Sequence, residues 1–109
     1  MIADLIDEES LLAGLHRSRR FLSRAIESRR IFFVELDGIR LYPAFYADPC
    51  YDRKQLGAVT KRLGELPGGS KLQFFQTPKG SLGGLTPLQA LRLGQAAAVN
   101  VAAEGFGSR

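Results

Sequence analysis

Side chains that bind metals or act as nucleophiles are scarce in this 109-residue sequence, which has one cysteine, one histidine and no tryptophan. Because Cys50 is alone, the chain can form no internal disulfide and no Cys-x-x-Cys metal knuckle. His16 has no second histidine or adjacent cysteine with which to form a metal or nucleophile site. We therefore expect a binding protein, not an enzyme, with no cofactor and no metal. A cleft lined by His16, Asp48 and Cys50 would instead favour a small enzyme.

Long apolar runs are missing as well. No run approaches the roughly 18 residues of a membrane span. The first nine residues are acidic, whereas a secretory signal peptide begins with basic residues. The content of 45% hydrophobic and 24% charged residues is typical of a folded globular protein. These features predict a cytoplasmic protein that has no membrane partner.

Positive charge is concentrated in one short segment. The formal net charge is +4, but residues 1–16 carry four acids and no lysine or arginine. Residues 17–30 carry six arginines against one glutamate. Such a concentration favours a nucleic-acid partner. The alternative is a solvated basic helix that packs on a helical neighbour.

Hydrophobic periodicity predicts two short helices in this part of the chain, separated by a turn at His16–Arg17. Asp7 is expected to cap the first helix, and Ser18 the second, which runs to about Ser28. Apolar side chains share one face of the second helix: Phe21, Leu22, Ala25 and Ile26. The opposite face is polar and basic: Arg20, Ser23, Arg24 and Glu27.

A β-hairpin is predicted within residues 31–45. Asp37-Gly38 lies between two β-rich runs and favours a two-residue turn with positive φ at both positions. A hairpin closed there places Glu35 opposite Arg40, which is a favourable cross-strand charge pair. Pro43 lacks an amide donor and marks the end of pairing or a sheet edge.

Two helices joined by a turn, followed by a hairpin wing, have the lengths of a winged helix-turn-helix. In such a unit the exposed face of the second helix enters the major groove, where arginine can read guanine and serine can bind phosphate. The predicted contacts to double-stranded DNA are Ser18, Arg19, Arg20, Ser23 and Arg24. Predicted phosphate contacts are Arg29, Arg30 and Arg40.

The segment LLAGLHRSRRFLSRAIESRRI at residues 11–31 resembles the winged helix-turn-helix of MerR-like and excisionase-like proteins. The segment resembles the pattern S-R-x-x-x-x-R-x-I-x-x-x-R-I, which in these proteins leads into a short hairpin. His16 stands where that pattern usually has glycine, and Arg17 where it usually has a small apolar residue. The resemblance implies a DNA-binding unit, and DNA readers of this kind bind two half-sites as homodimers.

Residues 46–109 are expected to form a small, mostly helical domain. Asp52 caps a predicted helix that contains Leu56, Val59, Leu63 and Leu66 and that ends at Pro67-Gly68-Gly69. Residues 71–76 fit a short helix or a strand, and residues 78–85 form a glycine-rich loop. Thr86 and Gln89 then provide a capping box, with Pro87 at the first helical position. Gly94 is expected to end that helix, and a last helix covers residues 95–104.

The stretch FFQTPKGSLGGLTPLQALRLG at residues 74–94 resembles the toxin-binding domain of bacterial antitoxins of the Xre/MbcA/ParS kind. The matched positions are Leu82-Gly83-Gly84, Thr86-Pro87-Leu88, Leu91 and Gly94, and the likeness extends over residues 52–104. Phe replaces the tryptophan frequent before the loop. The resemblance implies a cognate toxin as partner, often of the RES type. Predicted contacts to that partner are Leu82, Leu85, Thr86, Pro87 and Arg92.

Two alternatives remain for the glycine-rich loop. One is a purely structural entry into the helix at Thr86, with Leu82 and Leu85 in the core. The other is a phosphate loop that uses Lys79, although no Walker or dinucleotide-binding motif is present. The sequence therefore predicts an α+β protein: a winged helix-turn-helix over residues 1–45 and a helical toxin-binding-like domain over residues 46–109. The competing interpretation is a protein-interaction module that has lost DNA binding.

Overall fold

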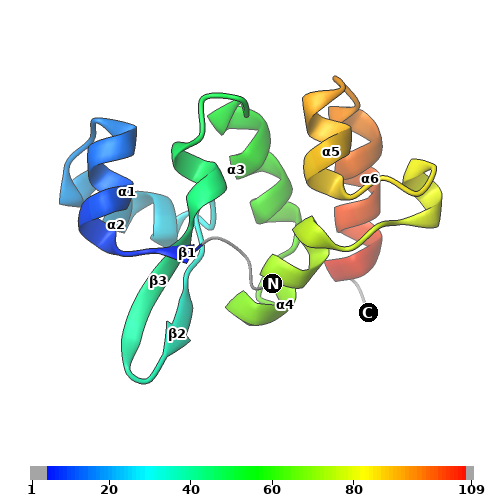
Figure 1. Cartoon of the computed structure of the whole chain (residues 1–109). Helices are drawn as coiled ribbons and strands as arrows, with labels where there is room; N and C mark the ends of the chain where they lie inside the picture. The colour runs from blue at the N-terminus through cyan, green and yellow to red at the C-terminus, as the bar shows by residue number, and fades with distance from the viewer. Residues whose placement is uncertain (1–4, 108–109) are drawn as a thin grey trace.

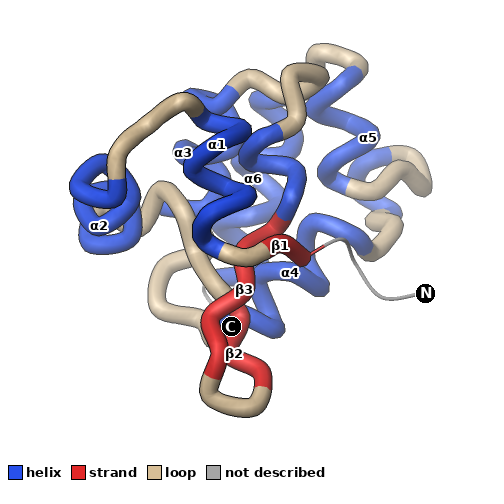
Figure 2. Tube along the Cα trace, turned by 60° about the vertical axis from the view of Figure 1, so that its left-hand side comes forward, coloured by secondary structure: helices blue, strands red, loops and turns tan. Residues whose placement is uncertain are grey.

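The computed structural model describes residues 5–107, which form an α+β fold of six α-helices, two short 3-10 helices and a three-stranded antiparallel sheet (Figure 1). The helices account for most of the chain, and the strands form a ribbon that projects from them (Figure 2). Within the described residues no helix is long and apolar enough to cross a membrane. The α+β class predicted from the sequence is therefore confirmed at this level.

The hairpin consists of β2 (Val34–Leu36) and β3 (Ile39–Pro43), joined at Asp37-Gly38. Both turn residues have positive φ, 52° and 77°, as a two-residue turn requires. Glu35 pairs with Arg40, as predicted. The periodicity and the turn signal were therefore sufficient to fix this register.

A strand that the sequence did not reveal completes the sheet. β1 (Leu5–Ile6) pairs with β3, so that the strand order is β1-β3-β2. Leu5 pairs with Pro43, and β3 ends there. With only two residues, β1 is too short for alternation to show. It joins the segment just before the first helix to the base of the hairpin.

The first two helices, α1 (Glu8–Leu15) and α2 (Arg19–Glu27), have the predicted caps. A carboxylate oxygen of Asp7 accepts from the Ser10 amide at 2.8 Å, and Ser18 Oγ accepts from the Phe21 amide at 3.3 Å. Between them His16 ends α1 in the left-handed region, with φ 55°. The turn therefore takes a left-handed conformation without the glycine that usually supplies it.

The helix predicted to begin after Asp52 and to end at Pro67 is shorter than expected, and residues 71–76, which fitted a helix or a strand, are helical. α3 (Arg53–Arg62) ends at Leu63, and Gly64 follows with φ +68°. Pro67 then becomes the N-cap of α4 (Gly68–Gln76), so the prediction that Pro67-Gly68-Gly69 ends a helix is wrong. A Cβ at position 68 would collide with the Phe33 carbonyl. Glycine is needed there for close approach to the hairpin, which local sequence signals cannot reveal.

The C-terminal helices follow the prediction more closely. Thr86 and Gln89 form the capping box at the start of α5 (Pro87–Arg92), through hydrogen bonds of 3.1 and 2.9 Å. Gly94, with φ +80°, separates α5 from α6 (Ala96–Gly107), which is longer than predicted. The 3-10 helices η1 (Ala44–Ala47) and η2 (Gly80–Leu82) were not predicted.

The core crosses the predicted domain boundary at residue 45. The Phe32 and Phe75 rings are stacked, with centroids 6.1 Å apart and an interplanar angle of 8°. Phe45 lies 4.8 Å from Phe75. Phe32, Phe45 and Phe75 are all nearly inaccessible. Since rings from both segments pack together, the N-terminal and C-terminal halves share one apolar interior.

Candidate nucleic-acid interface

The face of α2 that sequence analysis assigned to DNA is on the surface. Arg20, Ser23 and Arg24 are exposed, while Leu22 and Ala25 are 2% and 1% exposed. We call these three exposed residues the outer face of α2. The predicted division of α2 into an apolar inner side and a polar outer side is therefore confirmed.

The charge at the start of α2 is the opposite of that at the start of α1. Glu8 and Glu9 occupy the first turn of α1, where the helix dipole favours anions. The first turn of α2 has no acid and begins with Arg19 and Arg20. Arg19 Nε forms an exposed ion pair with Glu8 Oε2 at 2.7 Å. Arg20 forms no ion pair with an acidic side chain of the described residues. Helix stability therefore does not explain its positive charge.

The three predicted phosphate contacts lie at the end of α2 and on the hairpin. Arg29 Nη2 is 2.6 Å from Glu65 Oε2, and both side chains are largely exposed. Arg30 Nε donates to Ser28 Oγ at 2.8 Å. The Arg40 guanidinium lies over the Phe33 ring at 4.2 Å. An exposed ion pair such as that of Arg29 is worth about 0–1 kcal/mol, so a phosphate could replace its carboxylate at small cost.

The tip of the hairpin carries an apolar pair that sequence analysis did not single out. Leu36 and Ile39 lie opposite one another and are 47% and 61% exposed. Figure 2 shows this tip projecting away from the helices. Apolar side chains on a projecting ribbon next to a cation, here Arg40, suit contact with a groove wall or with another macromolecule.

The residues predicted to contact a toxin are not all on the surface. Leu82 is 4% exposed and Pro87 is fully buried. The burial of Leu82 agrees with the alternative in which the glycine-rich loop is a purely structural entry into the helix at Thr86. Leu85 and Thr86 are half-buried, and Thr86 is engaged in its capping box. Arg92 is exposed. Burial raises the pKa of Tyr51, and the nearby Arg92 charge partly offsets this rise.

Sequence analysis missed two exposed apolar side chains of the C-terminal half. Leu93 follows α5 and is 64% exposed, and Val101 on α6 is 72% exposed. Neither carries a local signal, because leucine and valine in a helical pattern are usually core residues. Leu93 directly follows the exposed Arg92 in the sequence.

The structure brings together only part of the cluster that would favour an enzyme. A groove of about 330 Å³ is lined by His16 and Asp48, among other residues, while Cys50 is exposed and does not line it. Asp48 Oδ1 accepts from the Cys50 amide at 2.8 Å. Within residues 5–107, no group of three or more His, Cys, Asp or Glu side chains could hold a metal ion.

A basic pocket between α2 and α3 was also missed. Arg53 and Lys54 form the first turn of α3, where the helix dipole disfavours cations. That placement was readable from the sequence once Asp52 was taken as the cap. What the sequence could not show is that Arg17 and Arg30, from either end of α2, line the same pocket.

Four surface features of residues 5–107 are thus accessible to a partner: the outer face of α2, the hairpin tip, the α2–α3 pocket and the exposed C-terminal side chains. Comparison of the chain with protein-family models, with curated proteins and with solved structures found no match.

Proposed function

We propose that this chain is a DNA-binding regulator whose residues 5–45 act as a winged helix-turn-helix, with α2 as the recognition helix. The supporting observation is the exposed basic outer face of α2, which begins with cations where helix stability would favour anions. Two helices, a tight turn at His16 and a hairpin follow one another in the order of the winged pattern. β1 pairs with β3 and so holds the hairpin beside the helix pair.

In this proposal Arg20, Ser23 and Arg24 contact base edges or phosphates in the major groove. Ser18 and Arg19 lie at the start of the helix, where recognition helices meet the groove. Arg29, Arg30 and Arg40 contact the backbone from the end of α2 and from the wing. A homodimer would present two such helices to a two-fold operator.

The test is binding of the purified protein to a duplex from its own promoter, titrated between about 50 and 200 mM salt. We expect binding that weakens steeply with salt, because each cation–phosphate contact releases counterions. The variant Arg20→Ala/Arg24→Ala should bind about 100-fold more weakly, as two contacts of about 1–3 kcal/mol each are lost. Arg53→Ala/Lys61→Ala is the control with the same change of net charge. Absence of binding at low salt would contradict the proposal.

The exposed C-terminal side chains support a second role, binding of a protein partner in the manner of an antitoxin. Arg92 and Leu93 are adjacent in the sequence and exposed, and Val101 on α6 is exposed as well. The test is co-purification with the co-expressed product of the neighbouring reading frame, compared between wild type and Leu93→Ser/Val101→Ser. Unchanged or absent co-purification would leave DNA binding as the only role proposed.

A further inference from the structure

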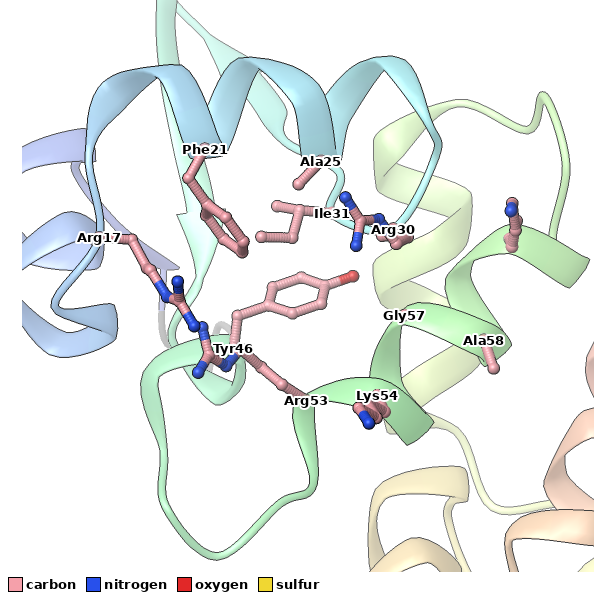
Figure 3. A pocket seen from close by; sticks show the side chains of 11 residues that line it. Arg17, Phe21, Ala25, Arg30, Ile31, Tyr46, Arg53, Lys54, Gly57 and Ala58 are labelled. Carbon is pink, nitrogen blue, oxygen red and sulfur yellow. The ribbon is translucent and has the colours of Figure 1, made fainter.

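The pocket between α2 and α3 has an apolar floor and a basic rim. Its volume is about 450 Å³, which lies within the range of about 300–1,000 Å³ typical of small-molecule sites. Figure 3 shows side chains from α2, from η1 and from α3 converging on this space. The lining residues are Arg17, Phe21, Ala25, Arg30, Ile31, Tyr46, Arg53, Lys54, Gly57, Ala58 and Lys61.

The rim contains five cations and no carboxylate. No ion pair within residues 5–107 involves a cation of the pocket. Three exposed arginines outside the pocket do form ion pairs: Arg19, Arg29 and Arg62. The remaining exposed arginines outside the pocket form none with the described residues: Arg20, Arg24, Arg40 and Arg92. The positive potential of the rim is therefore left for an external anion.

Two of these cations converge on one aromatic ring. The Arg17 guanidinium carbon is 5.1 Å from the centroid of Phe21, and that of Arg53 is 5.8 Å from it. In Figure 3 the two side chains extend toward one another, from the turn before α2 and from the start of α3. Two like charges on one ring repel each other, and an anion bound between them would remove that repulsion.

The floor of the pocket is apolar and held in place. Ala25, Ile31 and Tyr46 are 1%, 5% and 2% exposed. The Tyr46 hydroxyl and Thr60 Oγ1 are hydrogen-bonded at 2.5 Å, and Thr60 Oγ1 also donates to the Leu56 carbonyl at 2.8 Å. Since the single Thr60 proton is used there, the tyrosine must donate. Its ring therefore has a fixed orientation beneath the rim.

We infer that this pocket binds a small organic anion with a flat aromatic body, such as an aromatic carboxylate or sulfonate. The anionic group lies between Arg17 and Arg53, and the aromatic body lies against the half-buried Phe21 ring. Inorganic phosphate would leave that ring uncovered, and a duplex is too wide to enter a cavity of about 450 Å³. This ligand site is additional to the DNA-binding function proposed above.

The experiment is isothermal titration calorimetry with 1-naphthoate as the probe. We expect saturable binding to the wild type. The variant Arg53→Gln/Lys61→Gln should bind the probe at least about tenfold more weakly, since two exposed rim charges are lost. Its matched control, Arg20→Gln/Arg24→Gln, loses the same charge from the outer face and should bind within about twofold of wild type. Circular dichroism checks that both variants are folded.

Two further probes separate the two halves of the inferred ligand. Neutral 1-naphthalenemethanol and inorganic phosphate should each bind at least about tenfold more weakly than 1-naphthoate. Equal binding of phosphate would overturn the inference in favour of a bare anion site. Equal binding of the alcohol, equal losses in the two variants, or no saturable binding of 1-naphthoate would also overturn it. DNA binding by the outer face is measured separately with the promoter duplex, so either proposal can fail alone.

Discussion

Two basic surfaces use α2, and they differ in what lies around their charges. On the outer face, Arg20 and Arg24 are exposed cations on a convex helix. In the α2–α3 pocket, cations surround a concave space whose floor includes Ala25 and Tyr46. A convex cationic face suits a long polyanion, whereas a concave apolar floor selects for the body of a small ligand. Arginine content alone does not distinguish these roles, and only the shape of the surface does.

Charge reversal gives the largest expected difference between the two surfaces. Arg20→Glu/Arg24→Glu should weaken duplex binding by about 1,000-fold or more, because attraction to phosphate is replaced by repulsion. Arg53→Glu/Lys61→Glu changes the net charge equally and should cost less than about tenfold. Electrophoretic mobility shift at fixed salt measures both. Equal losses would show that overall charge, and not the outer face, governs DNA binding.

The buried support of the pocket gives the next largest effect. Thr60→Val removes the acceptor of the Tyr46 hydroxyl and should lower the free energy of unfolding by about 1–3 kcal/mol. Ser23→Ala on the outer face should change it by less than about 0.5 kcal/mol, since its side chain is exposed. Urea denaturation compares the two variants. Similar values for both would argue against a rigid pocket floor.

The stability of the protein at alkaline pH also distinguishes the buried pocket floor from the exposed outer face of α2. Burial raises the pKa of the Tyr46 hydroxyl well above its usual value near 10. As pH rises above about 10, the unfolded chain loses this proton while the folded chain keeps it, so stability falls. Tyr46→Phe should reduce that fall, by about 1 kcal/mol at pH 11. Burial also raises the pKa values of Tyr42 and Tyr51, so part of the fall should remain.

Arg20→Ala/Arg24→Ala is the control for this pH experiment, because it changes only the outer face. Its stability should follow the wild-type dependence on pH between about 9 and 11. Thermal unfolding monitored by circular dichroism at several pH values measures the dependence. A Tyr46→Phe variant that loses stability as steeply as the wild type would place the titrating group elsewhere.

Features set by neighbouring residues were predictable from the sequence. The caps at Asp7, Ser18 and Thr86 and the hairpin register at Asp37-Gly38 all depend on contacts within a few residues. The burial pattern of α2 followed from helical periodicity. Local rules were therefore enough for most elements and for the outer face of α2.

Features that depend on distant contacts were not predictable. Position 68, the first of α4, needs glycine because a side chain there would collide with Phe33, 35 residues earlier in the chain. β1 exists because β3 offers it a partner. Leu82 and Pro87 were predicted to contact a partner because they belong to a motif of a toxin-binding family, but both are buried. The pocket combines residues 17–61 and so has no local signature beyond the cations that begin α3.

The cations that begin α3 give the prediction with the smallest expected effect, a change in the free energy of unfolding. Arg53 occupies the first position of α3, where the dipole disfavours positive charge, so Arg53→Glu should raise the free energy of unfolding by about 0.3–1 kcal/mol. Arg24 lies in the last turn of α2, where a cation is favourable, and Arg24→Glu should lower it by a similar amount. Urea denaturation at low salt measures both. If Arg53→Glu is destabilising, the contact of Arg53 with Phe21 supports the fold, and its charge no longer argues for an anionic ligand.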